Sequence, residues 1–536
     1  MRHFLLLFVA LTLPLLAQHD PGRGAIRLLA RGEIEKTLEM VEKAPKRSNS
    51  SIDEAERDFV KLMVACHQNK PVEAFRLAKK SVANGLPITR LGVGPREKLE
   101  VLHAHEPYQR WLAKQPTQRV PGLLHGPMLG SVTDTSVSIW VRTAEQADVQ
   151  MRVMSQSANP KIKPEMIREV TIKTTAAKDY TGVLKVEGLT PGQEYFYTLV
   201  VEDRLPEAGA NQVFSFRTYP KQGAASKFNF VFGGCAGYTP EYEKMWSRIA
   251  DAKPLALLML GDNVYIDDPE HQLTNQYCYY RRHSQSDWRK LVSSTAVSSI
   301  WDDHDFGMND CQGGPAIDEP AWKRSVFETF RNNWVNHGYA GGDKQPGVWH
   351  DFYIGDVHFI LLDCRYYRDR DSGTMIGPVQ KKWLMETLKN SEGTFKMLAS
   401  SVPWSAGVKP GSKDTWDGFT DEREEIFGVI RDLKIEGVVL MAADRHRVDY
   451  RKTPRPDAYD LYEMMSARLT NVHTHAMVEN AKGSEFIMGH NKTPAFANVE
   501  IDTTLDNPTL TYRIITIENE KVGKAELKLS QLKFEN

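Results

Sequence analysis

A chain of 536 residues is too long for one ordinary hydrophobic core, which predicts roughly two to four domains. Hydrophobic residues make up 41% and charged residues 26% of the chain, as is typical of globular proteins. Lys and Arg number 68 against 69 Asp and Glu, which gives a formal net charge of −1. Nucleic-acid-binding proteins usually carry a basic excess or stripe, so no nucleic-acid-binding surface is expected.

The N-terminus has the pattern of a secretory signal peptide. A basic start at Met1-Arg2-His3 precedes an apolar run from Phe4 to Ala17 and then polar residues. We expect a signal peptide over residues 1–17 and a secreted or periplasmic protein; a buried N-terminal helix is the alternative. The run is short for a membrane span, and no other stretch is long and apolar enough, so no transmembrane anchor is expected.

Residues 20–116 are predicted to be helical. Leu28, Leu29, Ile34, Leu38 and Val41 recur near helical spacing, and similar runs follow. Breaks at Lys70-Pro71 and Asn84-Gly85 separate the helices. Stacked helical hairpins of the tetratricopeptide kind are one arrangement that this pattern allows.

Residues 118–220 change to a period of two, which indicates β-strands. Val137, Ile139 and Val141 alternate with smaller neighbours, as do Tyr195 and Tyr197. The turn at residues 188–192 precedes Tyr195, where the tyrosine corner of an immunoglobulin-like sandwich would lie. We therefore predict a seven-strand sandwich of the immunoglobulin or fibronectin-III type, acting as a spacer or a wall.

Residues 226–536 contain apolar strands that run into polar clusters, with helical segments between them. This alternation predicts a layered α/β core with helices on its faces. Ligands of such folds bind beyond the carboxyl ends of the strands, so the clusters should converge on one rim. The clusters begin at Cys235, Asp262, Asp302, Asp363, Ser400 and Asp444.

The segment Gly261-Asp262-Asn263-Val264-Tyr265 offers two metal ligands. One carboxylate can bridge two cations, because each oxygen can bind a different ion. The phenol of Tyr265 binds a metal only as phenolate, and its ordinary pKa is about 10, so a strongly acidic metal is needed. The alternative is that Asp262 caps a strand and Tyr265 packs in the core.

Two later clusters add ligand types. Acidic residues and His304 crowd residues 302–305, and Asn309 supplies a neutral amide oxygen that suits a hard divalent cation. Asp444 and His446 are two residues apart, so both side chains project to one side of an extended segment. A solvated acidic loop and a hydrogen-bonded structural histidine are the respective alternatives.

Cys235 lies in Gly233-Gly234-Cys235-Ala236-Gly237, directly after a predicted strand. It can be a thiolate metal ligand, a cysteine version of the α/β-hydrolase nucleophile elbow, or an inert buried thiol. The elbow would explain neither the Asp262–Tyr265 pair nor Asn309. The chain has five cysteines, an odd number that leaves at least one thiol unpaired.

Together these motifs resemble the PhoD-type alkaline phosphatases of the calcineurin-like metallophosphoesterase superfamily. The resemblance covers about residue 118 onward and follows the family's motif order, which is Gly234-Cys235, residues 261–265, residues 301–310, residues 362–368 and Asp444-Arg445-His446. One departure is Ala443, where the family usually has Gly. It matters if that position needs a positive φ.

The resemblance implies a role for each matching residue. Ferric iron would be bound by Cys235, Asp262, Tyr265 and His446, and calcium by Asp262, Asn309 and Asp444, with other divalent ions as alternatives. Arg365 would bind phosphate oxygens as a fork, and His304 would protonate the leaving group or hydrogen-bond the phosphate. Thiolate, phenolate and imidazole do suit a transition metal, and an all-oxygen set suits calcium.

The predicted function is hydrolysis of phosphate monoesters, diesters or both, with a hydroxide activated by a dinuclear metal site. Two other functions stay open at this point. One is a hydrolase with Cys235 as nucleophile, which chelators would spare. The other is an extracellular binding protein that kept the fold without activity. The sequence sets no oligomeric state.

Overall fold

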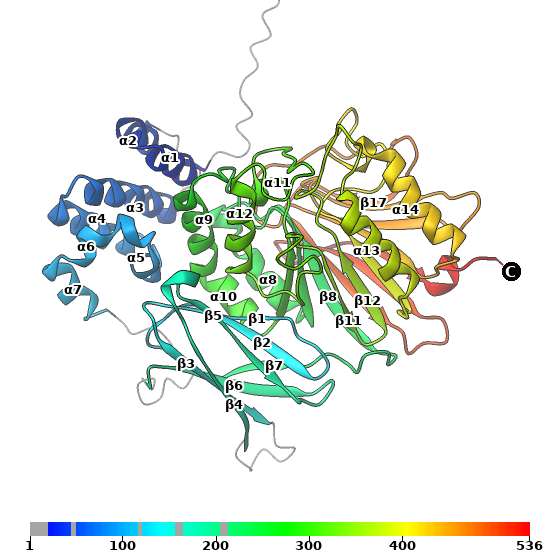
Figure 1. Ribbon diagram of the computed structural model, residues 1–536, viewed down its shortest axis with the longest axis horizontal. Coiled ribbons are helices and arrows are strands. Elements are labelled where there is room, and N and C mark those ends of the chain that lie inside the picture. The colour runs from blue at the N-terminus through cyan, green and yellow to red at the C-terminus, as the bar shows by residue number, and fades with distance from the viewer. Residues whose placement is uncertain (1–19, 44–49, 116–119, 156–164, 204–212, 536) are drawn as a thin grey trace, which may run out of the picture.

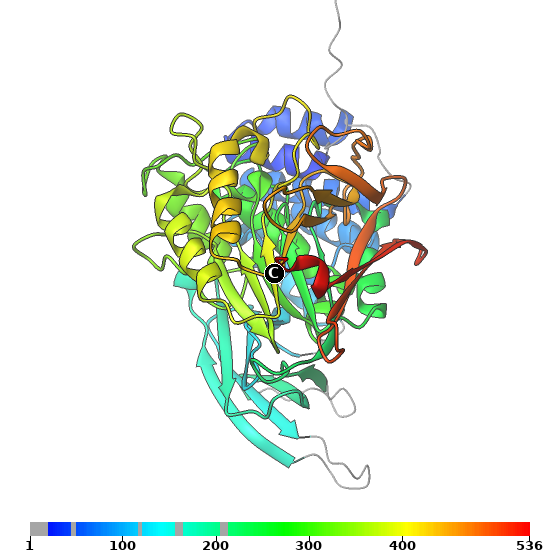
Figure 2. The same ribbon diagram turned by 90° about the vertical axis from the view of Figure 1, so that its right-hand side faces the viewer.

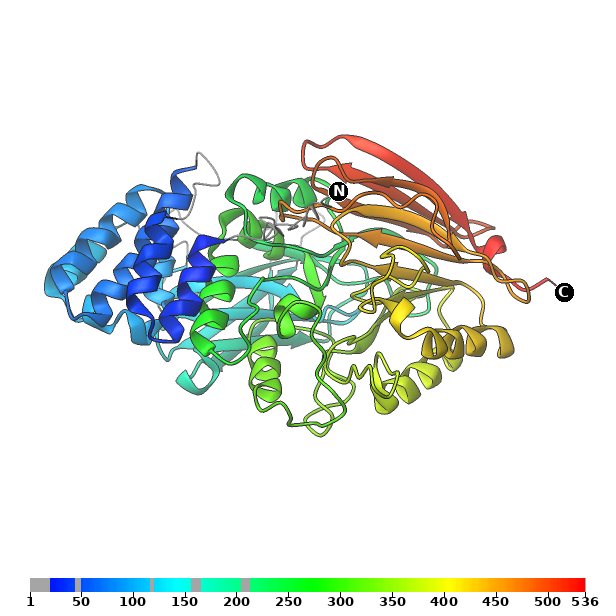
Figure 3. The same ribbon diagram turned by 90° about the horizontal axis from the view of Figure 1, so that it is seen from above.

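The computed structural model describes residues 20–43, 50–115, 120–155, 165–203 and 213–535. The predicted signal peptide lies outside these residues. Helices, a β-sandwich and an α/β core follow one another along the chain (Figure 1). Figure 3 shows the N-terminal helices and the C-terminal strands at opposite ends of the long axis. Among the described helices, none combines the length and the apolar character that crossing a bilayer requires.

The N-terminal region is helical, as predicted. α4 begins at Pro71, where Pro is tolerated in the first turn, and ends before Asn84, so both predicted breaks bound this helix. α3 and α4 pack side by side and share a buried face that includes Phe59 and Leu77. The helices are α1 (Pro21–Ala30), α2 (Ile34–Lys43), α3 (Ser51–His67), α4 (Pro71–Ala83), α5 (Thr89–Val93), α6 (Glu100–His103) and α7 (Glu106–Leu112).

Seven strands between residues 123 and 217 form two layers. β1, β2 and β5 form one layer and β4, β3, β6 and β7 the other. Figure 2 shows these strands projecting from the core. Tyr195 forms a tyrosine corner, since its hydroxyl accepts the Thr190 N–H at 2.8 Å. The strands are β1 (Leu123–Gly130), β2 (Ser136–Thr143), β3 (Asp148–Ser155), β4 (Glu165–Lys173), β5 (Thr181–Glu187), β6 (Glu194–Val201) and β7 (Phe214–Arg217).

The sandwich is not separated from the core as two independent domains would be. β1 pairs in parallel with β10 of the core at Gly130 and Val297, so one sheet of nine strands runs through both parts. β2 is buried on both faces because its outer side also packs against the core, where the Trp140 indole donates to the Asn332 carbonyl at 2.9 Å. The sequence predicts the sandwich and the α/β core as separate domains, without this shared sheet.

The core has two sheets with helices between their strands. The first continues as β20-β19-β18-β8-β9-β10, and the second has the order β11-β12-β13-β14-β16-β15-β17. Phe230 of β8 and Phe359 of β12 meet edge to face at 5.0 Å. The strands are β8 (Lys227–Gly233), β9 (Ala256–Leu260), β10 (Ala296–Ile300), β11 (His350–Ile354), β12 (Val357–Leu361), β13 (Phe395–Ala399), β14 (Val438–Ala442), β15 (Val448–Thr453), β16 (Leu461–Ser466), β17 (Glu485–His490), β18 (Ala495–Asp502), β19 (Thr509–Thr516) and β20 (Lys521–Lys528).

The central strands of both sheets run in parallel. β8, β9 and β10 pair in parallel in the first sheet, and β12, β13, β14 and β16 do so in the second. Every residue of β9, β10, β12, β13 and β14 is buried, which explains the continuous apolar sequences of β9 and β14. The core helices are α8 (Met245–Asp251), α9 (Gln272–Ser284), α10 (Ser286–Val292), α11 (Asp303–Phe306), α12 (Trp322–Arg331), α13 (Gly377–Lys389) and α14 (Thr420–Asp432).

We expect Tyr195→Phe to lower the free energy of unfolding by about 1 kcal/mol, because the Thr190 N–H loses its acceptor. Differential scanning calorimetry measures the change. Tyr353→Phe is the control, since the Tyr353 hydroxyl makes no hydrogen bond among the described residues. Equal shifts in the two variants would contradict the tyrosine-corner role.

Candidate metal centre

The ends of three strands, each paired in parallel with a neighbour, bring the predicted ligands together. Cys235 follows β8, Asp262 follows β9, and both Asp444 and His446 follow β14. The Cys235 N–H donates to the Gly261 carbonyl at 3.2 Å, and the Ala236 N–H donates to the Asp262 carbonyl at 2.7 Å. The loops after β8 and β9 are therefore fastened to each other beside the ligands.

Four of the predicted ligands have left-handed backbone conformations. The φ angles are 55° at Cys235, 53° at Asp262, 60° at Asp444 and 48° at His446. Such conformations cost about 1–3 kcal/mol each and cluster at functional sites. Ala443 is not among the residues with positive φ, so the departure from Gly at that position strains nothing.

The loop after β9 is held by Asp305. This buried carboxylate accepts the N–H groups of Asn263 at 3.1 Å and Val264 at 2.8 Å. Gly261 lies at φ 104°, and a Cβ there would come within 2.6 Å of the Asp302 Cβ. Gly at position 261 is thus required by a turn that packs directly against the next strand end.

The first predicted ligand set converges. The Cys235 Sγ lies 3.5 Å from Asp262 Oδ2, and the Tyr265 hydroxyl lies 3.1 Å from that same oxygen. The Tyr265 hydroxyl is also 3.1 Å from His446 Nε2. Cys235, Asp262 and His446 each offer one ligand atom within 4.8 Å of the others. All four side chains are buried, so they can surround one ion.

The imidazole of His446 is oriented as in many metal sites. Its Nδ1 lies 3.1 Å from the His473 carbonyl, so a proton on Nδ1 is donated there and Nε2 faces the other ligands. Burial, and then the neighbouring His473 and His475, hold the pKa of His446 well below its usual range. The ring is therefore neutral and able to bind a metal through Nε2.

Burial raises the pKa of the Cys235 thiol well above its usual range, and the carboxylates of Asp262 and Asp444 raise it further. Burial, followed by Asp262 and Cys235, does the same to the pKa of the Tyr265 phenol. A nucleophilic cysteine needs a lowered pKa, so the hydrolase-elbow alternative is disfavoured. Both groups would ionise only beside a cation, which fits a metal site.

The second predicted set meets at a cavity of about 300 Å³. Asp262, Asn309 and Asp444 all line it, although Asn309 is exposed. Asp444 Oδ2 is buried and makes no hydrogen bond within the described part of the chain. Its nearest cationic nitrogens are 3.8 Å away on Arg445 and 4.0 Å away on Lys409. An oxygen in this state is suited to bind a cation.

Asp303 and His304 also approach the cavity side of Asp262. Each offers a ligand atom within 4.8 Å of Asp262 and of the other. We did not assign Asp303 as a ligand from the sequence, although it lies in the predicted acidic cluster. A cation bound beside Asp262 on this side would therefore have Asp303 as an additional oxygen donor.

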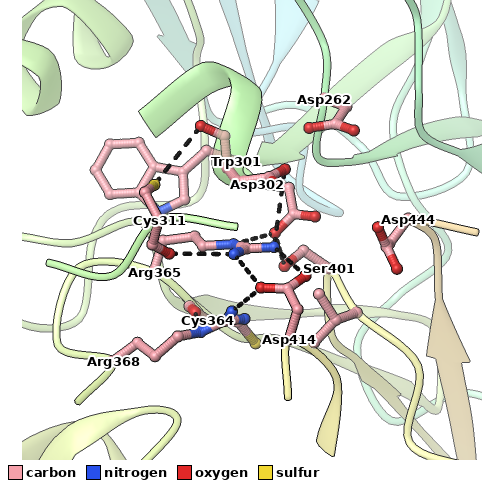
Figure 4. Close-up of polar contacts among 12 residues, drawn as sticks. Asp262, Trp301, Asp302, Cys311, Cys364, Arg365, Arg368, Ser401, Asp414 and Asp444 are labelled. Atoms are coloured by element: carbon pink, nitrogen blue, oxygen red, sulfur yellow. Dashed lines mark hydrogen bonds and ion pairs between the residues drawn. The ribbon is translucent and has the colours of Figure 1, made fainter. Parts of the chain in front are cut away.

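Arg365 does not have the position that its predicted role requires. Its guanidinium is fully buried and lies between two carboxylates, with Asp302 on one side and Asp414 at 2.7 Å on the other (Figure 4). It also donates to the Cys311 carbonyl at 3.2 Å, and it does not line the cavity. The prediction that Arg365 binds phosphate oxygens is therefore corrected: its nitrogens neutralise the buried carboxylates of Asp302 and Asp414.

His304, the predicted proton donor or phosphate ligand, lines the cavity. Its Nδ1 is hydrogen-bonded to Asp267, and its ring stacks on Tyr265 with centroids 4.3 Å apart. Burial lowers the pKa of His304, but the carboxylates of Asp303, Asp267 and Asp262 outweigh burial and raise it to about 10. The imidazole is therefore protonated at neutral pH.

Four further residues of the cavity wall were missed at the level of sequence. Lys409 and Arg445 bring positive charge, and His473 and His475 bring imidazoles. Arg445 adjoins a predicted ligand and could have been found from that position. Lys409, His473 and His475 lie in irregular segments without a recognisable motif, so nothing in the local sequence marks them.

Comparisons with known proteins give two family matches. A model described as PhoD-like phosphatase matches residues 230–512, and one described as a domain of unknown function (DUF7800) matches residues 120–216. Alkaline phosphatase D of Bacillus subtilis (strain 168) is 24% identical over 392 residues, which cover 61% of this chain and 66% of the relative. The chain thus spans just under two thirds of that protein.

Two solved structures share the fold. A structure of PhoD aligns with a TM-score of 0.62 at 16% identity, covering 76% of this chain and 90% of the other. Purple acid phosphatase PPD1 from yellow lupin (Lupinus luteus) seeds aligns with a TM-score of 0.54 at 12% identity, covering 76% and 75%. These likenesses agree with the predicted layered metallophosphoesterase fold.

We expect Gly261→Ala to destabilise the protein by about 2 kcal/mol or more, since it combines a left-handed backbone with a clash at Asp302. Gly373→Ala is the matched control, because Gly373 has φ 71° and no atom near its added Cβ. Its cost should be about 1 kcal/mol. Thermal unfolding of both metal-free variants separates the two contributions, and equal losses would contradict the close packing.

In metal-free protein, His304 should make stability depend on pH. Its pKa is raised to about 10 in the folded chain, against an ordinary value of about 6.5 when unfolded. The stabilisation is therefore complete below pH 6.5 and is lost as the pH rises toward 10. Denaturant unfolding of wild type and His304→Gln across this range measures it, and parallel pH profiles would refute it.

Proposed function

Since the chain belongs to the PhoD-like phosphatase family, we propose that it is a secreted, metal-dependent hydrolase of phosphate esters, acting on monoesters, diesters or both. The observation that carries the proposal is the buried convergence of a thiol, a phenol and an imidazole on the carboxylate of Asp262. Secretion is proposed from the signal-peptide pattern of residues 1–17.

Two metal ions are proposed, with Asp262 as the shared ligand. Cys235, Tyr265 and His446 would complete the first site; their thiolate, phenolate and imidazole donors suit a transition metal, and the family resemblance favours ferric iron. Asn309 and Asp444 would complete the second, and their oxygens favour calcium or another hard ion. Metal ions in such a pair supply Lewis acidity toward phosphate oxygens and lower the pKa of bound water.

We assign phosphate recognition to the cationic wall of the cavity. Lys409 Nζ lies within 4.0 Å of Asp444, and Arg445 adjoins the same carboxylate. A phosphate that enters between the ligands and this wall can accept charge-assisted hydrogen bonds from both side chains. Arg365 then acts indirectly, because it balances the charge of Asp302 and Asp414 beneath the site.

His304 is proposed as the proton donor to the leaving group. It lines the cavity, and in the metal-free chain the carboxylates of Asp303, Asp267 and Asp262 raise its pKa to about 10. Asp267 fixes the ring through Nδ1, so the proton would be delivered from Nε2. The stacked Tyr265 ring holds the imidazole beside the first ligand set.

The metal proposal is tested by elemental analysis together with the visible spectrum of the purified protein. We expect bound iron, a phenolate-to-iron absorption band, and loss of ester hydrolysis in chelator. Tyr265→Phe should abolish the band, whereas Tyr450→Phe, at a buried tyrosine of β15, should leave it unchanged. A colourless, metal-free protein that hydrolyses esters in chelator would contradict the proposal.

For phosphate recognition, we expect Lys409→Ala to raise KM for a phosphate ester by about tenfold, because one charge-assisted hydrogen bond is lost. Lys413→Ala in the same loop is the control, since Lys413 is exposed and does not line the cavity. Steady-state kinetics decides, and an unchanged KM in Lys409→Ala would assign the phosphate to other residues.

A further inference from the structure

The N-terminal helix α1 contacts the loop that carries Tyr265. We propose that Arg23 and Arg27 are positioning residues, through which the helical region supports the active site. The inference rests on the proposed function, because it assigns these residues to the same site. Residues 21–30 lie outside the part of the chain that the PhoD-like model matches, so the family resemblance supplies no role for them.

Both arginines bind the backbone just after the phenol ligand. Arg23 donates to the Tyr265 carbonyl at 3.1 Å, and its guanidinium lies 5.7 Å from the centre of the Tyr265 ring. Arg27 donates through Nε to the Ile266 carbonyl at 3.0 Å. Two successive carbonyls of the ligand loop are thus held from outside the metal centre.

The same arginines also hold Asp267. Its Oδ2 accepts from Arg23 at 3.0 Å and from Arg27 at 2.7 Å, while Oδ1 bonds to His304. The Ile266 and Asp267 N–H groups donate to the His304 carbonyl at 2.9 and 3.2 Å. The contacts therefore continue from α1 through Asp267 to a histidine that lines the cavity.

The helix α1 is itself fixed to the core. Asp20, which caps α1, forms an ion pair with the buried Arg281 of α9. Glu56 of α3 accepts from the Tyr277 hydroxyl of α9 at 2.7 Å and from Arg90 at 2.8 Å. These polar contacts hold α1 and α3 against α9, so the position of α1 beside the ligand loop is fixed.

The loss of Arg23 and Arg27 should displace the ligand loop, because both arginines neutralise the buried carboxylate of Asp267. Without the two guanidinium groups, Asp267 Oδ2 loses its ion pairs with Arg23 and Arg27, although its side chain is only 12% exposed. The contact of Oδ1 with His304 remains, but a buried carboxylate that loses two cationic partners is costly, so residues 265–268 would shift to reach water. That shift would misplace both Tyr265 and His304.

The test compares Arg27→Ala, Arg27→Lys and the double variant Arg23→Ala/Arg27→Ala with wild type. Arg31→Ala is the matched control, since Arg31 follows the same helix and is exposed. Hydrogen exchange of residues 262–268, bound metal, and kcat and KM are measured. We expect kcat to fall about tenfold in Arg27→Ala and further in the double variant, with KM within about twofold.

Exchange of the Ile266 and Asp267 amides should rise in the same order, and Arg27→Lys should lie between wild type and Arg27→Ala. Lysine keeps the charge, but it cannot reach the Ile266 carbonyl and Asp267 as a planar fork. Arg31→Ala should match wild type in every measurement. A structural role alone would lower thermal stability without changing exchange selectively at residues 262–268.

Two results would overturn the inference. One is a folded double variant with wild-type exchange and kcat. The other is global unfolding of Arg27→Ala and Arg27→Lys by circular dichroism, because a positioning role predicts folded variants. If the wild-type protein did not hydrolyse esters, the proposed function would be refuted. The hydrogen-exchange and metal measurements would still test whether α1 positions the ligand loop.

Discussion

The site depends on burying several carboxylates close together. Asp262, Asp302, Asp303 and Asp305 are each no more than 3% exposed, and charges so placed repel one another unless they are compensated. Asp305 is satisfied by backbone N–H groups, and Arg365 sits against Asp302. Burial nevertheless raises the pKa of Asp302 to about 7, although Arg365 opposes the rise.

Compensation is least complete on the cavity side, at Asp262 and Asp444. Burial raises the pKa of Asp262 well above its usual range, although protonated His304 opposes the rise. Asp444 Oδ2 makes no hydrogen bond among the described residues. Arg365 thus compensates the charge of Asp302, and metal ions would compensate Asp262 and Asp444, which line the cavity. This division explains why Arg365 is buried instead of facing the substrate.

Much of this arrangement could be predicted because ligand types and strand ends are local in sequence. Cys235, Asp262 and His446 each follow an apolar strand, and parallel strands bring such ends to one edge. The tyrosine corner at Tyr195 was marked by its turn. The role of Arg365 could not be predicted, because its partner Asp414 lies in a distant irregular segment.

Other features depend on tertiary contacts that leave no local signal. The parallel pairing of Gly130 with Val297 joins two predicted domains, yet each strand alone looks like an ordinary strand. His473 and His475 reach the cavity through a coil without periodicity. Arg23 resembles any basic residue of a surface helix until its contact with the Tyr265 carbonyl is seen.

The central proposal is that Asp262 would be shared by two metal ions, one of them also bound by Cys235, Tyr265 and His446. Anomalous diffraction from crystals of the purified protein, recorded on both sides of the iron absorption edge, tests it most directly. We predict two peaks, each beside a different oxygen of Asp262, with the iron-specific peak next to the Cys235 sulfur. A single peak, or peaks remote from Asp262, would contradict the account.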